Sequence, residues 1–146
     1  MCVAGYDALS EAKTQALLDD LDTRGLPRQH LEWYLIDVAT MMGNTKLLSH
    51  EVDECDRTLL FFEESLVHCM PETGSIRHFP RNLVHCFVDD YRMQEDPEDP
   101  HVLLRAELFS ITPHGEQLSW VRECVSHQDI PDAQRCVADW MSWLNR

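Results

Sequence analysis

The tetrapeptide Leu-Val-His-Cys occurs twice in this chain, at residues 66–69 and 83–86. Two histidines and two cysteines are a ligand set that zinc commonly uses. The spacing argues against a shared ion, because adjacent residues of a helix point about 100° apart and structural zinc ligands normally lie a few residues apart. We therefore expect no metal and no cofactor, with the cysteines facing the core and His68 and His85 at its edge.

Carboxylate and imidazole side chains also stand four residues apart, as Glu64 with His68 and as His85 with Asp89. A dinuclear iron centre would need a Glu-x-x-His step on each of two helices, and no predicted helix contains one. Couples four residues apart on a helix surface typically add only a few tenths of a kcal/mol to its stability. We assign these couples no site.

Nucleophilic catalysis is the third kind of chemistry to consider, since the chain has 6 Cys and 8 His. The local signatures of catalytic cysteines are missing, as are a Gly-x-Ser-x-Gly elbow and a phosphate-binding glycine loop. Only 5 Gly occur in all. The sequence therefore predicts no catalytic residues and a protein that is not an enzyme.

Helix signals are clearest at the two ends of the chain. A first helix is predicted from the N-cap Ser10 to the stop at Gly25, and a second from Pro27 to Gly43. The segment from Pro131 to the C-terminus places Trp140 and Trp143 on one apolar face, which predicts a closing helix.

The middle of the chain is less decisive. Residues 58–70 favour a helix, although the run Leu-Leu-Phe-Phe also fits a buried strand. A further helix is predicted from Pro80 through Tyr91. Residues 102–125 fit either two short helices or a hairpin that turns at Pro113-His114-Gly115, and the sequence leaves that choice open.

These elements predict a mainly α fold: one globular domain over 1–146, built as a compact helical bundle. The alternative is an α+β domain with a hairpin near 102–125 and a closing helix. In either fold the largest apolar side chains on the predicted faces should form the core. The expected core residues are Leu17, Leu21, Leu35, Val38, Phe62, Leu66, Phe87, Val137 and Trp140.

The compartment follows from what the chain lacks. No run of apolar residues approaches the roughly 18 that a membrane helix needs, and the first residues do not resemble a secretory signal. No Cys-x-x-Cys pair occurs. We therefore expect a cytoplasmic protein without membrane contact, whose cysteines are reduced and mostly buried.

Charge is the strongest functional signal. The formal net charge is -14 on 146 residues, a sign that repels nucleic acid and attracts basic protein surfaces. Two short segments concentrate the acid, each with one Arg. The predicted partner-binding residues are Glu51, Asp53, Glu54, Asp56, Glu63 and Glu64 in the first segment, and Asp89, Asp90, Glu95, Asp96, Glu98 and Asp99 in the second.

A binding protein is the function class that suits this acidity. The leading hypothesis is an immunity-type or antitoxin-type inhibitor that covers the basic active site of a toxin or nuclease. If the middle of the chain forms strands, the size, acidity and element order loosely resemble the acidic chaperones of type III secretion, which would imply an effector as partner. A nucleic-acid mimic that blocks a defence protein is the third alternative. The sequence does not indicate the oligomeric state.

Overall fold

The computed structural model describes residues 15–19, 47–70, 72–92 and 101–146. The chain divides after Pro80 into two compact units, each of which contains one antiparallel sheet. Of the first predicted helix, the structure describes residues 15–19, which are helical. The second, from Pro27 to Gly43, lies outside the described residues, and the single domain over 1–146 stays a prediction.

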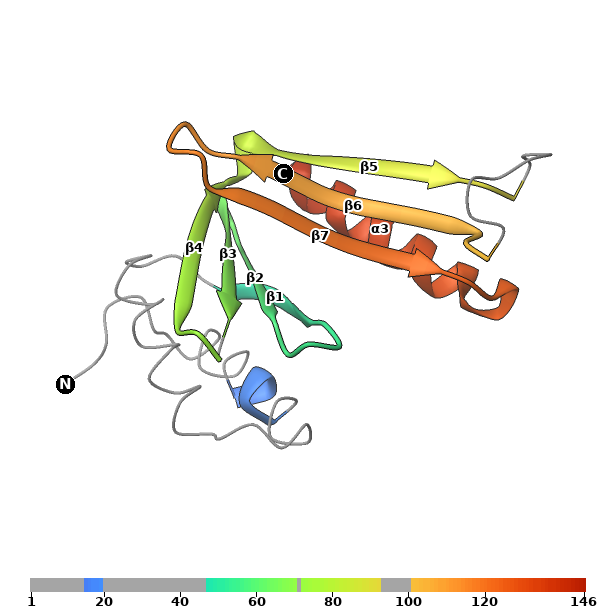
Figure 1. Cartoon of the computed structure of the whole chain (residues 1–146), viewed down its shortest axis with the longest axis horizontal. Coiled ribbons are helices and arrows are strands. Elements are labelled where there is room, and N and C mark those ends of the chain that lie inside the picture. The colour runs from blue at the N-terminus through green and yellow to red at the C-terminus, as the bar shows by residue number, and fades with distance from the viewer. Residues whose placement is uncertain (1–14, 20–46, 71, 93–100) are drawn as a thin grey trace. The chain divides into compact units, whose positions relative to one another are not determined.

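The first unit contains a four-stranded meander in which each strand pairs with the next along the chain (Figure 1). Its strands are β1 (Leu47–Val52), β2 (Thr58–Phe62), β3 (Ser65–Met70) and β4 (Ser75–Pro80). Leu17 and Leu18 of the helical segment pack with Leu60 and Val67 on one face of this sheet. These contacts fix which face of the sheet the segment covers.

Both faces of the two central strands are buried. All five residues of β2 are buried, as are Leu66 and Val67, which are adjacent in β3 and therefore point to opposite faces. The helix predicted over 58–70 is wrong. A strand buried on both sides has a continuous apolar run instead of a period of two, so the pattern did not separate it from a buried helix.

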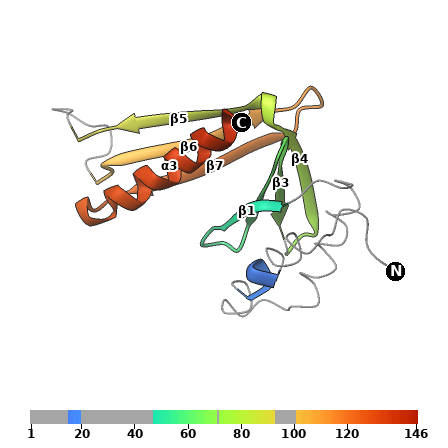
Figure 2. The ribbon, with the colours of Figure 1, turned by 180° about the vertical axis from the view of Figure 1, so that it is seen from behind.

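The second unit is a three-stranded meander with a helix across one face (Figures 1 and 2). The elements are η1 (Arg81–Leu83), β5 (Val84–Asp90), β6 (Leu104–Ile111), β7 (Gln117–Cys124), η2 (His127–Asp129) and α3 (Ile130–Leu144). Ile130 and Ala133 of α3 pack with Leu104 of β6 and Cys124 of β7. We call the covered side of this sheet the inner face and the opposite side the outer face.

Residues 102–125, for which the sequence left two alternatives, form the β6–β7 hairpin. The Thr112 amide donates to the Glu116 carbonyl at 2.8 Å, and the Gly115 amide donates to the Thr112 carbonyl at 2.9 Å. Gly115 has a φ of 85°, a conformation that residues with a side chain rarely adopt. The Pro-His-Gly sequence therefore supplies the turn that the hairpin alternative required.

The closing helix is confirmed as α3, with Trp140 and Trp143 both buried. Pro131 occupies its first turn, where the absence of an amide hydrogen costs nothing. At its end, the Asn145 side-chain amide donates to the Met141 carbonyl at 2.8 Å. Its apolar positions recur at three- and four-residue steps, a pattern that predicted the helix correctly because one face packs on a sheet and the other meets solvent.

The mainly α bundle is wrong, because the described residues are mostly strands in two antiparallel sheets. The alternative α+β fold placed the hairpin and the closing helix where they occur, but β1 to β5 precede them. The helix predicted from Pro80 is a single short turn, η1, followed by β5. Pro80 ends a strand here, so its role as a helix start was misassigned.

The predicted core residues that the structure describes are correct in the first unit and in the closing helix. The prediction is wrong for Phe87 of β5. Leu17, Phe62, Leu66 and Trp140 are buried, and Val137 is half-buried. Phe87 is 52% exposed on the outer face of β5. Leu21, Leu35 and Val38 lie outside the described residues.

Within the described ranges, no helix has the length and apolar character that crossing a bilayer requires.

Replacing Trp140 by Ala should lower the free energy of unfolding by about 3 to 5 kcal/mol, because the lost transfer energy and the new cavity add. Urea-induced unfolding followed by circular dichroism measures this change. The adjacent Met141 is exposed and provides the control, with an expected loss below about 0.5 kcal/mol for Met141→Ala. Equal losses in the two variants would show that the inward face of α3 has been misassigned.

Candidate functional site

The two Leu-Val-His-Cys segments both contribute to strands. His68 and Cys69 are adjacent in β3, and His85 and Cys86 are adjacent in β5. Neighbouring side chains in a strand point to opposite faces, so neither pair can bind one ion together. Among the residues the structure describes, no group of three or more potential ligands gathers to hold a metal.

The thiols of the two Leu-Val-His-Cys segments are poor nucleophiles. Burial raises the pKa of Cys69 to about 12, and burial also raises the pKa of Cys86. A nucleophilic cysteine needs a thiolate, which an apolar environment disfavours. Cys69 and Cys86 therefore fit packing positions better than catalytic ones.

The carboxylate and imidazole couples also fail in this fold. Residues four apart in a strand lie about 13 Å apart along its axis, whereas in a helix they would be neighbours. His85 and Asp89 are so separated on the outer face of β5, and Glu64 lies in the turn before β3. Neither couple is brought together.

The first acidic segment is divided between two ends of the sheet. Asp53, Glu54 and Asp56 lie in the β1–β2 turn, with Glu51 near the end of β1. Glu63 and Glu64 lie in the β2–β3 turn. The five residues of β2 separate the two turns by about 16 Å, so these carboxylates do not form one patch.

Asp53 organises the first of these turns. Its carboxylate accepts hydrogen bonds from the Arg57 amide at 2.8 Å and the Cys55 amide at 3.0 Å. It also accepts one from Arg57 Nε at 2.6 Å. Asp56 adopts a φ of 63°, a left-handed conformation that short polar residues tolerate in turns. Asp53 is thus committed to holding the turn.

The described part of the second acidic segment is the end of β5. Asp89 and Asp90 are exposed there, and Asp90 accepts hydrogen bonds from Arg92 Nη2 at 2.6 Å and Arg92 Nε at 2.9 Å. These hydrogen bonds lower the pKa of Asp90 to about 2. The remaining predicted site residues, Glu95, Asp96, Glu98 and Asp99, lie outside the described residues.

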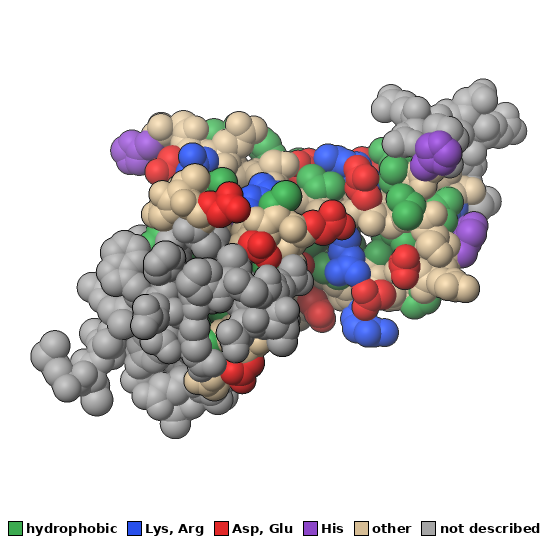
Figure 3. Space-filling model, turned by 60° about the horizontal axis from the view of Figure 1, so that its bottom comes forward, with side chains coloured by type: hydrophobic (Ala, Val, Ile, Leu, Met, Phe, Trp, Pro, Cys, Tyr) green, Lys and Arg blue, Asp and Glu red, His purple; other side chains and the backbone are tan. Residues whose placement is uncertain are grey.

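Figure 3 shows the consequence for the surface. On the face in view, acidic side chains stand singly among apolar, basic and uncharged ones. In the described part of the chain, the acidity of the sequence therefore does not translate into one continuous carboxylate patch on this face. The acidic side chains in view therefore do not by themselves define a candidate binding surface on this face.

The outer face of the β5–β6–β7 sheet is the candidate binding surface. Strand alternation places the buried residues of β6 beneath α3 and every second residue on the opposite side. The outer face consists of His85, Phe87 and Asp89 on β5, Arg105, Glu107, Phe109 and Ile111 on β6, and Gln117, Ser119, Val121 and Glu123 on β7.

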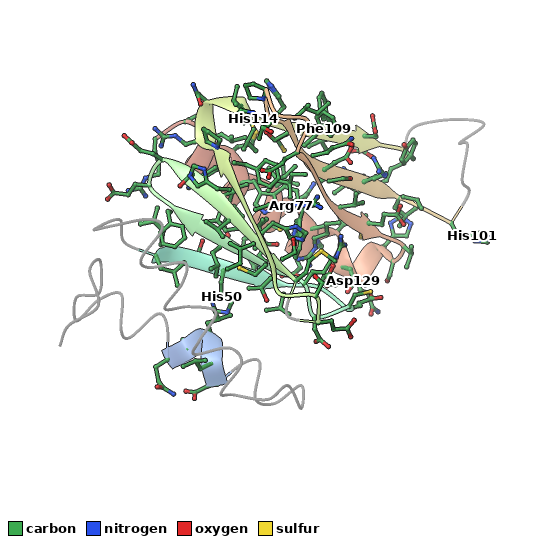
Figure 4. The ribbon with its side chains drawn as sticks, turned by 60° about the vertical axis from the view of Figure 1, so that its left-hand side comes forward. His50, Arg77, His101, Phe109, His114 and Asp129 are labelled. Carbon is green, nitrogen blue, oxygen red and sulfur yellow. The ribbon has the colours of Figure 1, made fainter. Side chains whose placement is uncertain are left out.

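Large apolar side chains are unusually exposed on this face. Phe87 is 52% exposed, Ile111 53% and Val121 39%. Phe87 also contacts two rings, with centroid distances of 6.2 Å to Phe109 and 6.4 Å to His85. Figure 4 shows Phe109 on β6. Exposed apolar groups gathered on one face are typical of interaction surfaces.

Charged side chains are placed between and beside these apolar groups. Phe87 and Val121 flank Glu107, because both stand opposite it in the two strand pairs. Ser119 donates a hydrogen bond to Glu107. Arg105 lies 3.7 Å from Glu107 and 3.6 Å from Glu123, measured between nitrogen and carboxylate oxygen. The outer face is therefore both apolar and acidic, with its arginine occupied by two glutamates.

Sequence reasoning missed this surface. Of the predicted site residues that the structure describes, only Asp89 belongs to it. Phe87 was assigned to the core, and Phe109 and Val121 were not singled out. The signal was the alternation of apolar and charged residues from Leu104 to Leu108, which indicates a strand with one buried face.

Comparison with known proteins gives no further identification: no protein-family model, no curated protein and no solved structure matches this chain.

Burial changes the acid–base behaviour of His68 in the first unit. It is buried in β3, opposite Arg77 of β4, which Figure 4 labels. Burial, with the positive charges of Arg57 and Arg77, lowers the pKa of His68 from 6.5 to about 4, against a smaller opposing effect of Asp53. His68 is therefore neutral in the folded protein at neutral pH.

This pKa predicts acid sensitivity. The His68 imidazole binds a proton more tightly in the unfolded chain than in the folded protein. The contribution of neutral His68 to the free energy of unfolding is therefore complete above pH 6.5 and is lost as the pH falls toward about 4. Between about pH 7.5 and pH 5 the His68 contribution should amount to about 2 kcal/mol. Urea unfolding at both pH values measures how much the free energy of unfolding falls from pH 7.5 to pH 5. In His68→Asn this fall should be smaller than in the original protein by about 2 kcal/mol. His78→Asn, at an exposed position of β4, should retain the full loss, and identical pH dependence in both variants would contradict the assignment.

The Asp53 turn gives a second prediction. Asp53→Ala should lower the free energy of unfolding by about 1 to 2 kcal/mol, because the turn loses charge-assisted hydrogen bonds. Glu54→Ala, at the exposed next position, should change it by less than about 0.5 kcal/mol. Urea titration of both variants at neutral pH tests this, and a similar small effect in both would assign Asp53 to the solvated surface.

Proposed function

We propose that this chain is a non-enzymatic binding protein that acts stoichiometrically on a basic protein, in the manner of an immunity protein or antitoxin. The observation that carries this proposal is the outer face of β5–β6–β7, where Phe87, Ile111 and Val121 are exposed among carboxylates. The partner would be held there and its basic active site covered.

The apolar groups supply the affinity. Binding energy at protein interfaces concentrates in a few side chains that become fully desolvated, and aromatic residues are prominent among them. Phe87 and Phe109 already contact one another, so little side-chain freedom remains to be lost when a partner covers them. Arginine of a basic partner can also stack on an aromatic ring as a cation.

The carboxylates favour a basic partner over a neutral or acidic one. Glu107, Glu123 and Asp89 stand on the outer face with Arg105 as its one basic side chain of Lys or Arg type. The formal net charge of -14 adds a long-range field of the same sign. Such a field raises the association rate with a basic protein and lowers it with nucleic acid or other acidic molecules.

The fold gives the predicted acidic segments a secondary role in this proposal. Glu54, Glu63 and Glu64 are exposed in turns and contribute to the field at a distance. Asp53 and Asp90 are each engaged by an arginine of their own turn. Direct contacts with a partner are therefore expected from the outer face, while the turns mainly influence the rate of encounter.

Substitution of Val121 by Arg tests the proposal. It places a bulky cation on the outer face of β7, opposite Glu107 of the central strand, and leaves the inner face and β5 unchanged. After capture of a partner from the expressing cells and its purification, titration calorimetry should show a one-to-one complex. Val121→Arg should weaken that complex at least tenfold, as loss of about 1.4 kcal/mol or more at an anchor requires.

Val125→Arg is the matched control, because Val125 is 63% exposed and lies after β7. It should leave the affinity within about twofold of the original. The partner should carry an excess of Lys and Arg, and its association rate should fall as salt concentration rises. A partner without basic excess, or equal affinities of the two variants, would refute the proposed function.

A further inference from the structure

β5 forms an edge of its sheet. It pairs with β6 on one side, and among the described residues no strand pairs with its other side (Figure 1). An edge strand presents unpaired amide and carbonyl groups that can accept another strand. Natural edge strands are usually protected by charged side chains, proline or a bulge. The acidic residues of β5, with the sequence VHCFVDD, are confined to its last two positions, and the strand has no lysine and no proline.

The side chains of β5 are exposed on both faces of the sheet. Phe87 on the outer face is 52% exposed, and Val88 on the inner face is 46% exposed. An edge strand with apolar groups open on both faces would gain from a neighbour that covers both at once. A second β-strand does this, whereas a helix or loop laid on one face does not.

The sequence of β5 is complementary to itself when read in the opposite direction. In an antiparallel pair of two β5 strands centred on Phe87, His85 of each copy stands opposite Asp89 of the other copy. The Phe87 side chains of the two copies stand opposite each other between these two pairs. On the other face Cys86 stands opposite Val88. Over residues 85–89 the cross-strand pairs therefore join an imidazole with a carboxylate, two aromatic rings or two apolar groups, which are pairs that stabilise antiparallel sheets, while the terminal pair sets Val84 opposite Asp90.

We propose that two copies of this chain pair through β5, antiparallel and about a two-fold axis at Phe87, to form one continuous six-stranded sheet. A two-fold interface must be self-complementary, because the same patch faces itself. β5 meets this condition over residues 85–89. The hydrogen-bonding geometry also permits it, since an antiparallel pair may be centred on either a hydrogen-bonded or a non-hydrogen-bonded residue pair.

The other edge of the sheet does not meet the condition. Pairing of two β7 strands about Val121 would place Ser119 opposite Glu123, and pairing about Trp120 would place Leu118 opposite Arg122. Neither arrangement provides a charge pair, and Arg122 already forms an ion pair with Asp132 of α3. The two proposals share Phe87, but pairing through β5 leaves Ile111 of β6 and Val121 of β7 open, and the dimer is tested by its own mass, so failure of one proposal does not imply failure of the other.

The first experiment measures the mass of the full chain by sedimentation and light scattering over a concentration series up to about 100 µM, a range that detects micromolar dimers. The expected result is a dimer whose dissociation constant rises at least tenfold in Phe87→Lys, which places two like charges at the axis. Ile111→Lys is the control, because Ile111 is 53% exposed on the same face but lies in β6. It should leave the dissociation constant unchanged.

The second experiment tests the register. His85→Asp should weaken the dimer about tenfold by opposing two carboxylates, and the exchange His85→Asp with Asp89→His should restore most of the affinity. Phe87→Cys should form a disulfide between copies under mild oxidation, because residues paired at the axis have Cα atoms about 4.5 to 5.5 Å apart. Ile111→Cys should not.

Circular dichroism confirms that each variant is folded. A monomer throughout the concentration series would overturn the proposal, and so would a dimer that Phe87→Lys leaves intact. An exchange variant that dimerises as poorly as His85→Asp alone would contradict the antiparallel register and with it the proposed interface.

Discussion

The packing of α3 on one face of the β5–β6–β7 sheet is the interaction on which the second unit depends. It buries Trp140 and Trp143 together with the inward residues of β6, and so supplies the core of this small unit. Because one helix covers one face, the other face meets solvent with whatever side chains alternate there. The exposed Phe87, Ile111 and Val121 are thus a direct consequence of where α3 lies.

The first unit follows a different plan, because both faces of its central strands are buried. His68 is buried as a result, between the apolar residues Val67 and Cys69 of β3. A histidine held between buried apolar groups and two arginines is kept neutral, which makes it a structural residue with an acid limit. The second histidine of the repeated tetrapeptide, His85, is exposed on β5. Identical local sequences therefore have different roles in the two units.

The acidity of the chain serves more than one purpose. Asp53 and Asp90 bind arginines within their own turns and stabilise the ends of strands. Glu107 and Glu123 share Arg105 on the outer face. The remaining exposed carboxylates contribute to the negative field around the chain. The number of acidic residues in the sequence could not distinguish these three groups of carboxylates, since the carboxylates are chemically alike and only their neighbours in the structure differ.

The sequence by itself determined the closing helix, the β6–β7 turn as one of two alternatives, and the net charge of -14. These features are local or additive: a helix face, a Pro-His-Gly turn and a sum of charges. Tertiary structure decided the rest. Residues 58–70 became strands because both their faces are buried, and Phe87 became exposed because α3 leaves the outer face of β5 uncovered. Long-range pairing and the choice of covered face depend on segments far apart in the chain, and a local pattern of apolar residues does not contain that information.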